Sequence, residues 1–164
     1  SPQPSQYAKL AAGKQYAVYS APSDTSFRAA NGKALLSTND WVQVFFEEDG
    51  YLLVQYAISR HQYRIGYIKA DAVSNLSEVA EIGSWANYPA QVLRTSALTD
   101  DPLNSCGAVM TLTAGQQVTY LGQLGQEWAF VETTTAQGQR IRGFVELSEL
   151  NVTRPDDADD NLNG

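Results

Sequence analysis

Hydrophobic and polar residues alternate in short runs along most of this chain, as in "YLLVQY" at 51–56 and "WAFVET" at 128–133. Short alternating runs bounded by turn residues are typical of β-strands, and no stretch keeps the 3.6-residue period of a helix. We therefore predict an all-β protein. The predicted strands lie at 15–19, 33–37, 41–47, 51–58 and 64–68, and again at 91–95, 109–112, 116–122, 127–134 and 140–145.

The chain also repeats itself. "IGYIKADAV" at 65–73 and "RGFVELSEL" at 142–150 share a Gly, an aromatic residue, a β-branched residue, a short turn and a closing aliphatic residue. Aligning Gly66 with Gly143 gives an offset of 77 residues, and element order and apolar positions agree along the preceding strands. We therefore predict one small fold used twice. The offset places Tyr51 opposite Trp128 and Val54 opposite Val131.

The outer parts of the two copies follow the same order. Upstream, "YAVYSAPS" at 16–23 matches "AQVLRTSA" at 90–97. Downstream, "KADAV" and "ELSEL" each predict one helical turn after the last strand. We expect Gly66 and Gly143 to allow a neighbouring strand to approach closely, because a glycine has no Cβ.

The stretch 111–150 runs through a Leu, a Gly-led turn, "VTY", a hairpin, "WAFV", "GFV" and a closing Leu. The opening "VLRTSAL" carries an Arg after Leu93, and the first copy keeps "APS" and "GYIKADAV". This order resembles the bacterial SH3-like (SH3b) domain, over 16–74 and 90–151. The resemblance implies two five-stranded SH3-like β-barrels in tandem, with cell-wall (peptidoglycan) peptides or a protein as ligand.

The repeat divides the chain into five parts. The segment joining the copies contains Ile82, Trp85 and Tyr88, which we expect to pack onto the barrels and hold them as a rigid pair. The tail is rich in Asp, which is typical of disorder. The predicted parts are a linker at 1–6, a first barrel at 7–76, a packed inter-domain linker at 77–89, a second barrel at 90–152 and an acidic disordered tail at 153–164.

Composition limits the possible partners. Of the 164 residues, 43% are hydrophobic and 10% aromatic, which is enough for a packed core. The net charge of −7 would repel a polyanion, so we expect no nucleic-acid partner. No apolar run approaches the roughly 20 residues that span a bilayer, so we expect no membrane insertion. We also expect a monomer.

The sequence offers little material for catalysis or metal binding. The single Cys106 and single His61 lie in different copies, so they are poor candidates for a nucleophile–base pair. Neither belongs to a cluster with metal-ligand spacing, and we expect no metal, no cofactor and no enzyme activity. "TDDPLN" at 99–104 lacks the pattern of a Ca²⁺ loop and is interpreted as a solvated loop.

Aromatic residues are the stronger signal for binding. Because side chains alternate along a strand, Tyr51 and Trp128 are expected on the outer faces of the fourth strands, where they either line a ligand groove or cap the core. The loop 20–32 would form the opposite wall. Arg140 and Arg142 share one face and could hold a carboxylate or form a surface ion network with a neighbouring Glu. The candidate ligand-binding residues are Tyr19, Phe27, Arg28, Tyr51, Arg94, Trp128 and Arg140.

These features together predict a non-catalytic binding module of a bacterial secreted or cell-envelope protein, located outside the cell or in the envelope. Two alternatives stay open. The chain could be the targeting segment of a larger cell-wall hydrolase, or an assembly or spacer domain that contacts other proteins and holds no small ligand.

Overall fold

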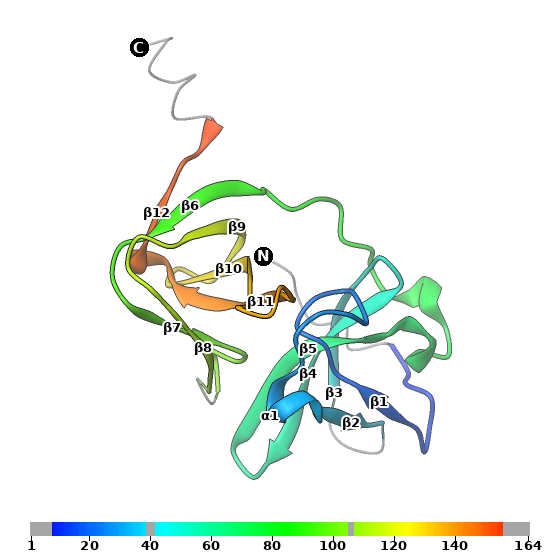
Figure 1. Cartoon of the computed structure of the whole chain (residues 1–164). Helices are drawn as coiled ribbons and strands as arrows, with labels where there is room; N and C mark the ends of the chain where they lie inside the picture. Colours follow the sequence, from blue (N-terminus) through cyan, green and yellow to red (C-terminus); the bar gives the residue numbers. More distant parts are fainter. Residues whose placement is uncertain (1–7, 39–41, 105–106, 156–164) are drawn as a thin grey trace.

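The structure is a computed structural model and describes residues 8–38, 42–104 and 107–155. Its regular secondary structure is almost entirely β-strand, which confirms the all-β prediction (Figure 1). The first elements are β1 (Gln15–Ala17), α1 (Ala29–Gly32), β2 (Leu35–Ser37), β3 (Val42–Glu48), β4 (Tyr51–Ser59), β5 (Gln62–Lys69) and the 3₁₀ turns η1 (Ala70–Ala72) and η2 (Leu76–Glu78). Then follow β6 (Tyr88–Val92), β7 (Ser96–Thr99), β8 (Ala108–Leu112), β9 (Gln117–Leu124), β10 (Trp128–Thr134), β11 (Arg140–Glu146), the 3₁₀ turn η3 (Leu147–Glu149) and β12 (Leu150–Val152).

The strands form three antiparallel sheets. β1 and β2 make a two-stranded sheet, and β3, β4 and β5 make a three-stranded one. A seven-stranded sheet has the order β12-β6-β9-β10-β11-β7-β8. Among the described residues none of these sheets closes into a barrel, so two closed SH3-like barrels stay a prediction. The strands β7 and β12 were not expected from the sequence.

Each half of the chain has its own hydrophobic core. The buried residues of one core lie between Tyr16 and Val79, and those of the other between Ala90 and Leu150. We call residues 8–79 the first half and residues 88–155 the second half. The predicted linker at 1–6 and the tail beyond 155 lie outside the described residues. No helix in the described part of the chain has the length and apolar character needed to cross a bilayer.

The two halves repeat the same local geometry. Gly66 in β5 and Gly143 in β11 are each followed by a 3₁₀ turn, as predicted. A Cβ added at Gly66 would lie 2.5 Å from Cγ1 of Val18, and one added at Gly143 would lie 2.7 Å from Cγ of Leu98. The close approach expected at both glycines is therefore confirmed.

The upstream alignment of 16–23 with 90–97 is wrong. Val18 and Leu98 occupy equivalent places beside the two glycines, so β1 corresponds to β7 rather than to β6. The error is a shift of six residues, and because strands have a period of two, such a shift leaves the alternation of apolar positions intact. The contacts that correspond to each other are Leu10 with Val73 in the first half and Val92 with Leu150 in the second.

A third hydrophobic cluster joins the halves. Both halves carry a β-bulge at the same place, which inserts Phe45 beside β4 and Leu121 beside β10. A bulge redirects the inserted side chain, and both residues belong to this third cluster. Its buried members are Phe45, Phe46, Leu53, Ile65, Tyr67, Leu121, Phe130 and Phe144, with Tyr19, Tyr51, Ile82, Trp85, Leu124 and Trp128 packed against them. We call this set the shared cluster.

The joining segment is part of this packing, as expected. The Trp85 ring lies 5.6 Å from the ring of Phe46 and 5.5 Å from that of Phe130, so it touches both halves. The Tyr88 ring stacks on Tyr120 at 6.0 Å. Each half therefore uses the same outer face, and these faces cover each other.

Candidate functional site

Three of the predicted site residues gather in the first half. The rings of Tyr19 and Tyr51 meet edge to face at 6.0 Å, and the guanidinium of Arg28 lies over the Tyr19 ring at 5.4 Å. Arg28 also donates to the carbonyl of Ala34 at 2.8 Å. Burial raises the pKa of Tyr51, and the charge of nearby Asp24 adds to the effect. The two tyrosine rings pack against each other, and Arg28 covers the face of Tyr19. A ligand therefore cannot enter between the rings.

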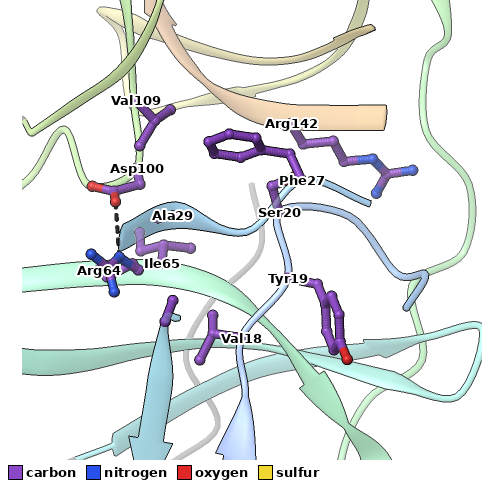
Figure 2. Close-up of a pocket in the computed structure, with 11 residues that line it drawn as sticks. Val18, Tyr19, Ser20, Phe27, Ala29, Arg64, Ile65, Asp100, Val109 and Arg142 are labelled. Atoms are coloured by element: carbon purple, nitrogen blue, oxygen red, sulfur yellow. Dashed lines mark hydrogen bonds and ion pairs between the residues drawn. The ribbon is translucent and has the colours of Figure 1, made fainter. Parts of the chain in front are cut away.

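The loop 20–32 packs on the second half. The N–H of Phe27 donates to the carbonyl of Arg140 at 2.8 Å, and its ring lies against the second core. Phe27 lines a small cavity of about 20 Å³ together with Val109 and Arg142 of that half. Figure 2 shows the Phe27 ring between these two residues. Such a volume accommodates about one water molecule. This loop therefore contributes to the contact between the halves.

An ionic network lies inside the same contact. Arg142 was expected at the surface, but its side chain is only 5% exposed because the first half covers it. It donates to both carboxylate oxygens of Glu48 at 3.0 and 3.1 Å and to the hydroxyl of Tyr67 at 2.8 Å. Its Nε donates to Glu132 at 2.9 Å. Burial opposes the charge of Arg142, but Tyr67 and the carboxylates raise its pKa above the ordinary value.

The loop after β7 is also an internal contact. Asp101, interpreted from the sequence as solvated, is fully buried and accepts a hydrogen bond from Nε2 of Gln55 at 2.7 Å. Asp100 pairs with Arg64 at 3.1 Å. Burial raises the pKa of Asp100, although Arg64 acts in the opposite direction. The interpretation of 99–104 as a solvated loop is therefore wrong for 99–102, because the first half provides partners for Asp100 and Asp101. Leu103 and Asn104 are exposed, as that interpretation expects.

The second half has an open groove. Two predicted site residues, Arg94 and Trp128, lie in it together, and its volume is about 290 Å³. Trp128 packs against the shared cluster and also lines this groove. We call this site the Trp128 groove, and its lining residues are Arg94, Thr95, Ser96, Ala97, Thr99, Trp128, Glu146 and Glu149.

One ion pair orders the wall of the groove. Nε of Arg94 donates to a carboxylate oxygen of Glu149 at 2.6 Å, and the hydrogen bond and charge of Glu149 raise the pKa of Arg94. Ser96 is close to the same oxygen, at 3.5 Å. The Arg94 side chain is 71% exposed, so its remaining N–H groups face solvent and could donate to a ligand.

The groove is open because the second half has small residues where the first has tyrosines. The equivalence of Val18 and Leu98 places Thr99 where the first half has Tyr19, and Ser96 where it has Tyr16. In the first half the Tyr19 ring fills this place and contacts Tyr51. The same fold therefore leaves one site filled and the other accessible.

The remaining candidates lie elsewhere. Arg140 pairs with Glu132 at 3.1 Å on the surface. His61 is exposed at the turn between β4 and β5, where its φ is 63°, and Cys106 lies outside the described residues. In the described part of the chain, no group of His, Cys, Asp and Glu has the arrangement of a metal site.

Sequence reasoning missed Glu146 and Glu149 as groove residues. A usable signal was present for the first of them. Glu146 is the first residue of the predicted helical turn, and the residue at the same place in the first copy is Lys69. The side-chain charge at this position therefore has opposite sign in the two copies. Comparing charges between the copies would have identified this position.

Comparisons with known proteins add little. No protein-family model matches the chain, and no curated protein matches it. A solved structure described as NlpC2 from Trichomonas vaginalis is similar, with 14% sequence identity and a TM-score of 0.34. The match covers 89% of this chain and 47% of that one, so this chain spans about half the length of that protein. A similarity at this level supports no inference about function.

Proposed function

We propose that this chain is a non-catalytic binding module in which two SH3-like halves, fixed to each other, present one ligand site, the Trp128 groove. The observation that carries the proposal is the groove beside Trp128 in the second half. In the first half, Tyr19 occupies the equivalent space and packs against Tyr51. The half-buried Trp128 ring that lines the groove offers a ligand apolar area at low entropic cost. The volume of about 290 Å³ matches a short peptide segment better than a large cofactor.

The ligand that we propose is a cell-wall peptide of a bacterial envelope, with a protein partner as the alternative source of such a peptide. This part of the proposal is supported by the resemblance of 111–150 to SH3b domains. It implies a monomer that acts without a cofactor, outside the cell or in the envelope. It applies equally if the chain is the targeting segment of a larger cell-wall hydrolase.

Retention on purified peptidoglycan tests the proposal. The full chain is incubated with sacculi, and the bound fraction is measured after sedimentation. Trp128→Ala is expected to abolish retention, whereas Tyr51→Ala, the matched change in the filled site of the first half, is expected to preserve it. Because Trp128 also packs against the shared cluster, Ala97→Tyr serves as a second variant. Ala97 is exposed in the groove, so a tyrosine there obstructs the site without entering the core.

Two outcomes would contradict the proposal in different ways. Retention that survives both Trp128→Ala and Ala97→Tyr would place the binding site elsewhere. A complete lack of retention at every salt concentration would favour the spacer or assembly function. One observation supports that second candidate, because the outer faces of the two halves cover each other, and such a contact suits a rigid spacer.

A further inference from the structure

The residue that faces the aromatic platform differs in charge between the halves. Trp128 in β10 pairs directly with Glu146 in β11, whereas Tyr51 in β4 pairs with Lys69 in β5. Residues directly opposite on antiparallel strands have Cβ atoms about 4.5–5.5 Å apart. A group resting at the Trp128 ring is therefore within reach of the Glu146 carboxylate. The first half offers an ammonium at that place instead.

The charge of Glu146 is only partly balanced within the groove. Glu146 is exposed, and its carboxylate has no hydrogen bond or ion pair among the described residues, although its charge acts on nearby Arg94. The one cation of the groove, Arg94, is held by Glu149 at 2.6 Å. With one arginine and two glutamates the groove carries a net charge of −1. Glu146 also borders a neighbouring hollow that contains Glu127, so the acidic surface continues beyond the groove.

An exposed carboxylate beside an indole ring, in a groove with a net charge of −1, suits a cation. The face of a Trp ring attracts an ammonium group through its quadrupole, and a carboxylate accepts charge-assisted hydrogen bonds from the same group. A neutral ligand could donate a hydrogen bond to Glu146 but would gain no attraction from the Trp128 ring, and it would leave the net charge of −1 on the groove. The net charge of −7 on the whole chain also favours approach of a cationic ligand.

We infer that the ligand of the Trp128 groove carries a primary ammonium group, held between the ring of Trp128 and the carboxylate of Glu146. The inference rests on the proposed function, since it names the chemistry recognised by the same groove. A peptide can supply this group from a lysine-type side chain or from its own N-terminus. Both sources have the same chemistry.

Binding of the tripeptide Ala-Lys-Ala in four forms distinguishes the sources. The forms are unmodified, acetylated on the N-terminus, acetylated on the lysine, and acetylated on both. Affinity is measured with the full chain by calorimetry, and the contact is located by the NMR shift of the Trp128 indole N–H. Acetylation on both amines is expected to weaken binding about tenfold, as the loss of one charge-assisted hydrogen bond implies. The single acetylation that reproduces this loss identifies the source.

Variants connect this effect to Glu146. Glu146→Gln keeps the shape of the side chain and is expected to reduce the difference in affinity between the unmodified and the doubly acetylated peptide to the smaller share that the Trp128 ring supplies. Glu78→Gln removes one exposed carboxylate from the first half and serves as the charge-matched control, which should keep the discrimination. Raising the salt concentration should weaken the unmodified peptide more than the doubly acetylated one.

The results separate the inference from the function on which it rests. If the wild-type chain binds all four forms equally and Trp128→Ala abolishes binding, the ammonium inference is wrong and the groove remains the binding site. If no form binds, or if Trp128→Ala leaves binding unchanged, the proposed function of the groove is overturned together with the inference. Discrimination that is undiminished in Glu146→Gln assigns the selectivity to another residue and also overturns the inference.

Discussion

Replacing Arg142 with Met is expected to lower the free energy of unfolding by about 3–5 kcal/mol, the cost of breaking a buried ion pair on one side. The Arg142 side chain is 5% exposed, and that of its partner Glu48 is 9% exposed. Without the guanidinium, Glu48 keeps only the hydrogen bond from the Tyr67 hydroxyl at 2.9 Å. Met retains the apolar stem of the arginine, so most of the loss comes from the uncompensated carboxylate rather than from packing.

Urea unfolding followed by Trp fluorescence measures this loss, and a double-mutant cycle identifies its cause. Glu48→Gln combined with Arg142→Met leaves no unpaired buried charge. The double variant is therefore expected to lose about 1–3 kcal/mol less than the sum of the single variants. Arg140→Met is the matched control, because Arg140 is an exposed partner of Glu132 and should cost at most about 1 kcal/mol.

Two results would refute this reasoning. A loss below about 1 kcal/mol for Arg142→Met would mean that the network contributes no more than a surface ion pair. Strict additivity in the cycle would mean that Arg142 and Glu48 act independently. Because the network connects the halves, Arg142→Met should also separate the unfolding of the two cores into two transitions if they unfold together in the wild type.

Three further predictions concern packing and pH. Gly143→Ala should cost about 1–3 kcal/mol in thermal unfolding, because its Cβ would meet a buried side chain at 2.7 Å, whereas Gly83→Ala, with nothing within 4 Å, should leave the melting temperature unchanged. Burial alone would raise the pKa of Glu132, but two arginines hold it below its ordinary value of 4.5, so the stability that this residue contributes is present above that value and lost as pH falls through the lower folded-state pKa. Glu132→Gln should therefore reduce the fall of the urea midpoint with decreasing pH below pH 4.5. The same dependence of the midpoint on pH in the variant and the wild type would contradict this assignment. Trp85→Ala should cost about 3 kcal/mol in urea unfolding because the indole touches both halves, and a loss near zero would show that the joining segment contributes no stability.

The strands and their inward faces could be predicted from the sequence because a period of two is a local property. A period of two puts Leu52 and Val54 on one face of β4 and Leu53 on the other. The structure assigns these faces to the first core and to the shared cluster. The partner of the outer face could not be predicted. An apolar side chain such as Leu53 or Phe130 has the same pattern whether it meets solvent, a ligand or another half of the chain.

The site followed the same rule. Trp128 and Arg94, which the structure brings together in one groove, were candidates because aromatic and cationic residues are conspicuous in sequence. The burial of Arg142 and Asp101 was missed, since it depends on contacts between residues that lie 94 and 46 positions apart. Whether a polar residue is solvated depends on tertiary contacts, and a local pattern does not contain them.

Because the outer faces of the two halves cover each other, cutting the chain between the halves would expose both faces. A fragment that ends between the halves would carry Phe45 and Leu53, or Phe130 and Phe144, into water as a contiguous aromatic and aliphatic surface. Apolar patches of this kind promote association. Each half therefore acts as a solubilising partner for the other, and a half expressed alone is expected to aggregate or dimerise through the exposed face, whereas the two halves mixed as separate chains should reassemble.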